Sequence, residues 1–86
     1  MTKKWIPLDQ LPVGSFGKVK ELALEGNIRR RMLDLGLVYD TTVESLRKSP
    51  AGDPTAYEIR GTVIALRSQE ASKILVESMY KEDFNE

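Results

Sequence analysis

The chain has 86 residues, and its 13 lysines and arginines balance 13 aspartates and glutamates, so the formal net charge is zero. A balanced charge predicts no general attraction to nucleic acid or acidic membranes, which only a local basic patch could provide. The sequence contains neither cysteine nor histidine, which excludes disulfides, thiolate sites and iron–sulfur clusters and removes the commonest metal ligand. We therefore expect no bound metal and no cofactor.

The length and hydropathy pattern predict one soluble cytoplasmic domain. A chain of this size fits a single domain with a thin core. No run approaches the roughly 20 apolar residues that cross a bilayer, and the N-terminal residues lack the apolar region of a signal peptide. We expect this domain to occupy residues 1–86, with a core over about 8–77, a lead-in over 1–7 and a tail over 78–86.

The first residues are expected to lack regular pairing. Leu8 and Leu11 can anchor this segment in the core, whereas Pro7 and Pro12 disfavour a strand. A turn then leads into a strand predicted over residues 16–24. Gly17 weakens that strand and indicates a bend or the close approach of another backbone.

One segment shows a convincing helical pattern, and the helix is expected near residues 28–35. Ile28, Met32 and Leu35 recur at i, i+4 and i+7, which places them on one stripe that faces the core. Asn27 precedes the stripe and has a side-chain oxygen that can cap the first turn. The stripe therefore predicts three buried positions.

The end of this helix is also marked in the sequence. Gly36 follows the stripe at the position where a left-handed residue commonly ends a helix. With that ending, Leu37 can fold back onto Met32.

The remainder of the chain predicts short strands. We expect strands over 41–47, 55–60, 63–67 and 74–77, a loop over 48–54, a tight reversal at 61–62, and a helical turn near 69–73 capped by Ser68. Five short strands with one inserted helix predict a mainly β (α+β) fold. Closure into a small, partly open barrel would protect the sheet edges.

No catalytic constellation is recognisable. The serines have no histidine to activate them, and the glycine-rich run at 14–18 lacks the spacing of a phosphate-binding loop. Asp53 lies in a glycine-containing loop, but one carboxylate does not make a calcium site. The sequence therefore predicts no enzymatic activity and favours a role in binding another molecule.

The predicted helix carries the best candidate surface. Leu33 lies roughly 140° from Ile28 around the helix axis, outside the core stripe. The simpler interpretation is that Leu33 supports the helix end, while the neighbouring arginines form a solvated face with one Arg30–Asp34 pair. The alternative is a partner-binding surface, with Leu33 as its apolar anchor and Arg29 and Arg30 around it.

The arginines at 29–31 also raise the possibility of nucleic-acid binding, because they could contact phosphates. The predicted sheet, however, lacks the exposed aromatic residues that stack on bases. Nucleic-acid binding is therefore the weaker alternative, and no nucleic-acid partner is expected.

Five short runs of the sequence resemble the FeoA family and occur in the family's order, and the likeness as a whole extends over about residues 8–77. They are R-R-R-M-L-D-L-G-L, G-D-P, Y-E-I-R-G-T, I-A-L-R-S-Q-E-A and I-L-V-E. The resemblance implies an SH3-like barrel and an accessory role in bacterial ferrous iron transport. It also implies a protein partner, the membrane transporter FeoB with its cytoplasmic GTP-binding domain, without direct insertion of this chain into the membrane.

The same fold occurs as a C-terminal domain of metal-dependent repressors of the diphtheria toxin repressor family, so fold alone does not decide function. We expect the free-standing transporter accessory, because no DNA-binding domain precedes the matching region. The chain departs from the family pattern at Asp40, where glycine is usual and a left-handed conformation is implied, and at Ala51, where a larger apolar residue is usual. The oligomeric state is left open.

The predicted partner-binding residues lie on the helix and on the 48–54 loop. They are Arg29, Arg30, Leu33, Leu37, Ala51 and Asp53.

Overall fold

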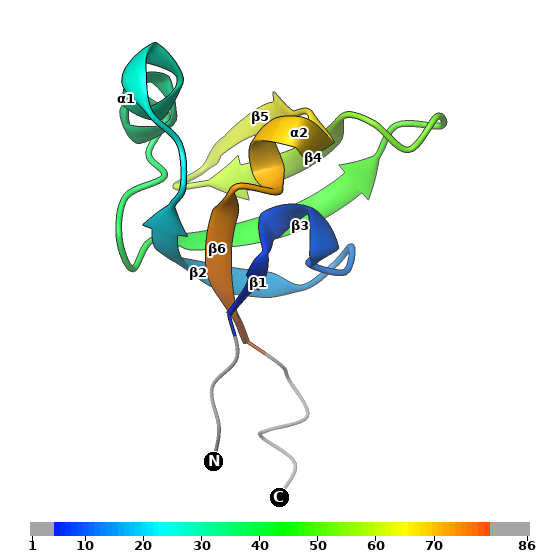
Figure 1. Ribbon diagram of the computed structural model, residues 1–86. Helices are drawn as coiled ribbons and strands as arrows, with labels where there is room; N and C mark the ends of the chain where they lie inside the picture. The colour runs from blue at the N-terminus through cyan, green and yellow to red at the C-terminus, as the bar shows by residue number, and fades with distance from the viewer. Residues whose placement is uncertain (1–4, 80–86) are drawn as a thin grey trace, which may run out of the picture.

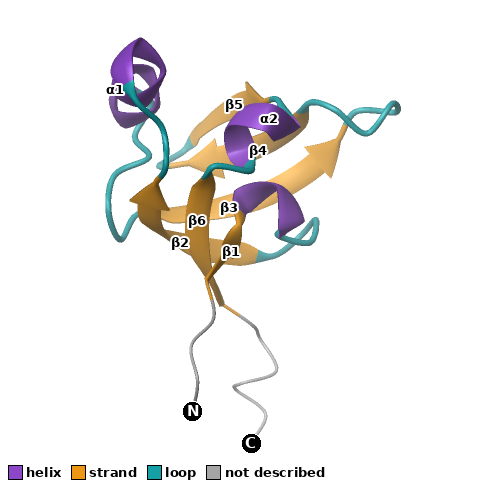
Figure 2. Ribbon diagram, viewed as in Figure 1, coloured by secondary structure: helices purple, strands orange, loops and turns teal. Residues whose placement is uncertain are grey.

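The structure is a computed structural model that describes residues 5–79 of the chain. The described residues form one six-stranded antiparallel sheet accompanied by short helical elements (Figures 1 and 2). In chain order, the elements are β1 (Trp5–Pro7), η1 (Leu8–Gln10), β2 (Phe16–Leu22), α1 (Gly26–Asp34), β3 (Thr42–Lys48), β4 (Thr55–Ile59), β5 (Thr62–Leu66), α2 (Ser68–Ala71) and β6 (Ile74–Met79). The predicted mainly β class with one inserted helix is confirmed.

The strand order across the sheet is β1-β6-β2-β3-β4-β5. The last strand of the chain thus lies between the first two, which brings both ends of the described chain to one side of the molecule (Figure 1). The predicted hairpin is formed by β4 and β5, which pair from Ile59 opposite Thr62 onward. Its two-residue turn places Arg60 at a positive φ of 52°, as the tight turns that suit hairpin twist require.

The two ends of the described chain differ from their predictions. Residues 5–7, expected to be unpaired, form a strand with Ile6 opposite Val76. Pro7 is accommodated because β1 is an edge strand, where the loss of one donor is tolerated. β6 extends to Met79, so the predicted tail begins too early, and its residues 80–86 lie outside the described part.

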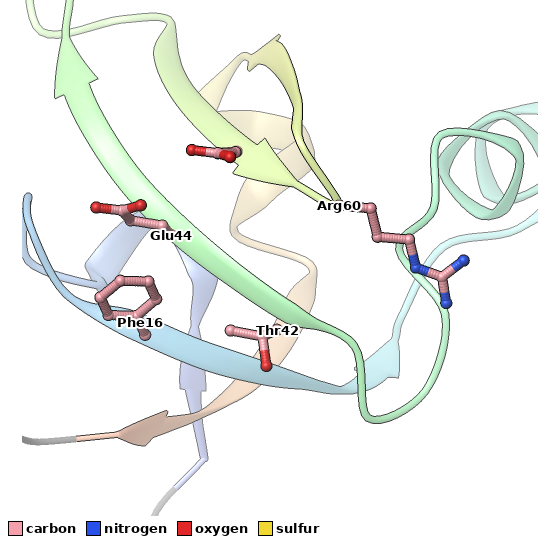
Figure 3. Close-up of a pocket in the computed structure, with 5 residues that line it drawn as sticks. Phe16, Thr42, Glu44 and Arg60 are labelled. Carbon is pink, nitrogen blue, oxygen red and sulfur yellow. The ribbon is translucent and has the colours of Figure 1, made fainter.

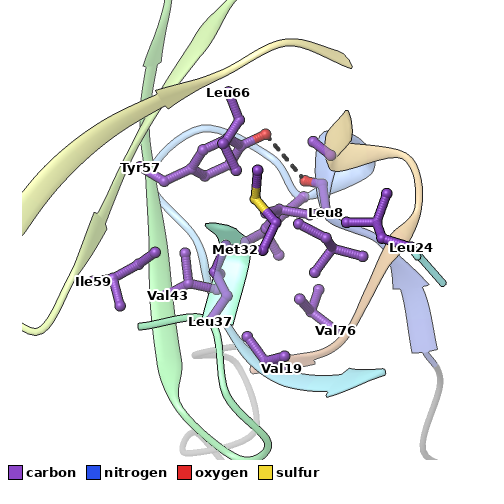
Figure 4. Packing of buried hydrophobic residues seen from close by; sticks show 13 residues of the cluster. Leu8, Val19, Leu24, Met32, Leu37, Val43, Tyr57, Ile59, Leu66 and Val76 are labelled. Carbon is purple, nitrogen blue, oxygen red and sulfur yellow. Dashed lines mark hydrogen bonds between the residues drawn. The ribbon is translucent and has the colours of Figure 1, made fainter. Parts of the chain in front are cut away.

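The two faces of the curled sheet differ in chemistry. Phe16, Thr42 and Glu44 line a hollow on the outer face (Figure 3), while the alternating residues Gly17 and Val43 are buried on the inner face. The inner face packs on the hydrophobic core shown in Figure 4. That core consists of Leu8, Leu11, Val19, Leu24, Met32, Leu37, Val43, Tyr57, Ile59, Leu66, Ala71, Ile74 and Val76. Leu8 and Leu11 therefore anchor the N-terminal segment as predicted.

One polar group in this core links β4 to the N-terminal segment. The Tyr57 hydroxyl donates a hydrogen bond to the carbonyl of Leu8 at 3.5 Å (Figure 4). Burial of the ring raises the pKa of Tyr57 to about 12, because the charged phenolate is disfavoured away from water. The side chain therefore remains a neutral donor at any physiological pH.

Helix α1 begins earlier and buries less of its surface than the sequence predicts. Asn27 lies within the helix, and Glu25 occupies the capping position without a side-chain cap. Met32 is fully buried and Leu35 packs partly against the core, but Ile28 is 46% exposed. The prediction for Ile28 was wrong because the N-terminal half of α1 stands clear of the sheet (Figure 1).

The C-terminal end of α1 follows its prediction closely. The amide of Leu37 donates to the carbonyl of Met32 at 3.1 Å, and the amide of Gly36 donates to the carbonyl of Leu33 at 3.0 Å. This pair of bonds is a Schellman motif, and it requires the positive φ of 107° at Gly36. A Cβ added at Gly36 would also lie 3.2 Å from Cγ2 of Ile59.

We expect Gly36→Ala to lower the free energy of unfolding by about 1–3 kcal/mol, because the new side chain imposes backbone strain next to Ile59. Gly52→Ala is a matched control: its φ is 91°, but no atom of the described residues lies within 4 Å of the added Cβ. Urea unfolding of both variants measures the difference. A loss for Gly36→Ala no larger than that for Gly52→Ala would contradict the packing argument.

Candidate partner-binding site

A shallow hollow of about 450 Å³ lies on the exposed side of α1. It is lined by Gly26, Arg29, Arg30, Leu33 and Asp34. Leu33 is half-buried, whereas the two arginines are exposed. The hollow therefore brings together three of the predicted partner-binding residues: Leu33 is the apolar one, and Arg29 and Arg30 are the charged ones.

The three consecutive arginines do not have the same role. Nη1 of Arg31 lies 3.4 Å from Oε2 of Glu70, so this arginine connects α1 to α2. Arg29 and Arg30 make no ion pair or side-chain hydrogen bond with any of the described residues. The Arg30–Asp34 pair of the simpler interpretation is accordingly not formed. Two guanidinium groups remain available at the edge of the hollow.

Leu37 does not belong to this surface. Its side chain is 0% exposed and packs in the core beside Met32 (Figure 4). The prediction that Leu37 contacts a partner was wrong, because the Schellman motif turns this residue inward.

The loop between β3 and β4 does not join the hollow either. Figure 1 places this loop and α1 at opposite ends of the molecule. Ala51 is exposed on the loop, but Asp53 is already engaged within the protein. Its Oδ1 accepts a hydrogen bond from the Ser68 amide at 2.8 Å, and its Oδ2 lies 3.8 Å from Nη1 of Arg67. Asp53 thus caps α2 from a distant loop, whereas a cap by Ser68 itself was predicted.

The turn after α1 exposes an aromatic side chain that the sequence analysis did not select. Tyr39 is 68% exposed, and Nζ of Lys20 lies 4.9 Å from the centre of its ring. The same Nζ lies 2.9 Å from Oδ1 of Asp40, whose φ of 70° is the left-handed conformation that the resemblance implied. This hydrogen bond lowers the pKa of Asp40 and raises that of Lys20. The signal in the sequence is an aromatic residue in a turn too short to bury it.

A surface for stacking nucleic-acid bases is not assembled around the arginines. Contrary to expectation, the sheet has an exposed aromatic, Trp5 on β1, which is 48% exposed. β1 and α1 lie apart in Figure 1, so this ring and the arginines do not form one surface. The absence of a nucleic-acid partner stays a prediction.

Neither a metal cluster nor a membrane-spanning helix is found between residues 5 and 79. Acidic side chains do not gather there in groups of three or more that could hold a metal ion. None of the helices in this range is long and apolar enough to cross a bilayer. The expectation that the protein binds no metal tightly stays a prediction.

The curled antiparallel sheet, with its helix inserted between β2 and β3, defines a small SH3-like domain. Residues 6–78 match the model of the FeoA domain. The chain therefore belongs to the FeoA family, which is associated with ferrous iron transport.

One similar protein combines two transport components in a single chain. It is the Fe(2+) transport protein A/Fe(2+) transporter FeoB fusion protein of Porphyromonas gingivalis, 31% identical over 70 residues. The match covers 81% of the present chain but only 8% of the fusion protein. The present chain thus corresponds to less than a tenth of that relative.

Solved structures of FeoA proteins are also similar. The FeoA-like protein from Clostridium acetobutylicum is 38% identical with a TM-score of 0.82, over 94% of this chain and 93% of that one. Stenotrophomonas maltophilia FeoA, an SH3 domain protein solved with zinc, is 30% identical with a TM-score of 0.69, over 88% and 89%. A manganese-dependent repressor, 20% identical with a TM-score of 0.79 over 92% of this chain and 44% of that one, shares the fold alone.

We expect Asp53→Ala to lower the free energy of unfolding by about 0.5–2 kcal/mol, because it removes the acceptor that caps the Ser68 amide. Asp53→Asn keeps an acceptor oxygen and should retain most of this stability. Thermal unfolding of both variants measures the effect. Full stability of Asp53→Ala would show that the bond between the loop and α2 contributes nothing.

Proposed function

We propose that this protein is a non-enzymatic, cytoplasmic regulator of ferrous iron uptake that binds the cytoplasmic part of a FeoB-type transporter, including its GTP-binding domain. The observation that supports this proposal most is the Porphyromonas gingivalis relative, in which transport protein A and FeoB are one polypeptide. Fusion raises the effective concentration of two modules for each other. Fusion of transport protein A to FeoB is therefore what we expect if the two modules act together.

The proposed role is regulatory because the chain offers poor ligands for ferrous iron. Without histidine or cysteine, its side chains can supply mainly carboxylate oxygens, which suit hard cations at low affinity. An influence on iron uptake therefore passes through contact with the transporter rather than through carriage of the ion.

The α1 hollow is the proposed contact surface. Protein interfaces concentrate their binding energy in a few central residues, and arginine is enriched among them. Leu33 provides an apolar anchor that is already half-buried, so little of its freedom is lost on binding. Arg29 and Arg30 have no internal partners among the described residues and can form charge-assisted hydrogen bonds with carboxylates of the transporter.

We expect Arg30→Glu to weaken binding to the transporter at least tenfold, equivalent to about 1.4 kcal/mol. The melting temperature should stay nearly unchanged, because the side chain is exposed and forms no ion pair with the described residues. Leu33→Glu should weaken binding as well, with its folding checked by circular dichroism. Calorimetric titration against the cytoplasmic GTP-binding domain and the full-length transporter, each with GTP and GDP analogues, provides the measurement.

Arg47→Glu is the matched control, because it makes the same charge change at an exposed position on β3, away from α1. It should bind within about twofold of the unmodified protein. Equal losses for Arg30→Glu and Arg47→Glu would show a general charge effect and remove α1 as the site. Failure of the unmodified protein to bind either transporter preparation would refute the proposed partner.

A further inference from the structure

The register of the sheet aligns five side chains in one row on its outer face. Met79 lies opposite Phe16, Phe16 opposite Glu44, Glu44 opposite Glu58, and Glu58 opposite Val63. Directly opposed residues in antiparallel strands place their side chains on the same face. We call these five residues the sheet-face row; it crosses β6, β2, β3, β4 and β5.

The row is apolar at both ends and acidic in the middle. Met79 is 41% exposed and Val63 is 55% exposed. Between them, Phe16, Glu44 and Glu58 contribute to the lining of a shallow hollow of about 210 Å³ (Figure 3). The row thus presents apolar side chains on either side of two carboxylates.

The two glutamates have no cationic partner among the described residues. Arg60 borders the same hollow, but Figure 3 shows its guanidinium directed away from Glu44. Nη2 of Arg60 instead donates a hydrogen bond to Oγ1 of Thr41 at 3.5 Å. The hollow therefore carries two carboxylates and one guanidinium, and neither carboxylate forms an ion pair with the described residues.

Two like charges directly opposite each other destabilise a sheet. A cationic group held between Glu44 and Glu58 would convert this repulsion into two attractive contacts. The ring of Phe16 beside Glu44 suits the apolar stem of an arginine or lysine and can interact with its charge. The chemistry of the hollow is therefore complementary to one basic side chain.

We propose that the sheet-face row binds an extended segment of a partner protein that presents one arginine or lysine between two apolar side chains. Neighbouring strands lie about 4.8 Å apart, so Phe16 is about 7 Å from the midpoint between the glutamates, and Val63 is equally far on the other side. Residues i and i+2 of an extended peptide are separated by about 6.7 Å on one face. When such a segment lies across the strands, its side chains at positions i, i+2 and i+4 therefore lie over Phe16, the glutamate pair and Val63, respectively. This site is separate from the α1 hollow and does not depend on the identity of the transporter partner.

The probe is the capped peptide Gly-Leu-Ser-Arg-Ser-Leu-Gly, titrated into isotopically labelled protein and followed by amide chemical shifts. We expect the shifts to concentrate at Phe16, Glu44, Glu58 and Val63. The same peptide with citrulline in place of arginine keeps the shape but loses the charge, and it should bind at least fivefold more weakly. Raising the salt concentration from about 20 mM to about 500 mM should weaken arginine-peptide binding, because exposed charges are screened.

The double variant Glu44→Gln and Glu58→Gln should bind the arginine peptide at least fivefold more weakly. Its melting temperature should rise by about 1–5 °C, because the repulsion across β3 and β4 is removed. The double variant Glu21→Gln and Glu25→Gln removes the same charge at exposed positions outside the row and should bind normally. Should the first variant fold poorly, Glu58→Gln alone carries the test.

Three results would overturn the proposal. The first is the absence of shifts along the row at about 5 mM peptide, a concentration high enough to reveal a dissociation constant in the millimolar range. The second is equal binding of the arginine and citrulline peptides. The third is a protein that self-associates in sedimentation experiments and becomes monomeric in the Glu44→Gln and Glu58→Gln variant, which would show that a second copy occupies the row.

Discussion

The burial of Met32 beneath the curled sheet determines which residues of α1 are available to a partner. Successive helical residues are about 100° apart, so Arg31 and Leu33 lie on opposite flanks of Met32. Arg31 is directed to Glu70 of α2, while Leu33 lies in the hollow with Arg29 and Arg30. The contact that fixes the helix to the core therefore also sets the orientation of the proposed binding surface.

A net charge of zero conceals two surfaces of opposite sign. Two arginines without an ion pair among the described residues border the α1 hollow, and two glutamates of the same kind occupy the centre of the sheet-face row. Composition alone predicts a protein without electrostatic preference. The structure instead separates the charges, so that one neutral domain carries an acidic surface on its sheet and a basic surface on α1.

Local features of this fold could be predicted from the sequence, because their causes lie within a few residues. Helix periodicity located Met32, and the glycine after the helix located the Schellman motif. The grouping of Arg29, Arg30 and Leu33 follows from the same periodicity. These inferences needed no knowledge of distant contacts.

The features that sequence analysis missed depend on distant parts of the chain. Periodicity assigned Ile28 to the core, but it carries no information on how far a helix extends beyond its sheet. The pairing of β1 depends on β6, more than sixty residues away, and the capping of α2 by Asp53 depends on a loop from β3. Likewise, no local pattern could place Phe16 beside Glu44, because the sheet-face row exists only once five strands have found their register.

The most direct test of the account is hydrogen exchange of this protein with and without the cytoplasmic part of a FeoB-type transporter. Binding at the α1 hollow should slow exchange at the amides of residues 26–34, because a partner would cover the exposed side of α1 and hold the helix in place. Amides of the 49–54 loop, at the other end of the molecule, should exchange at their original rates (Figure 1). Protection of that loop without protection of α1, or no protection of α1 under conditions where the complex forms, would contradict the central claim.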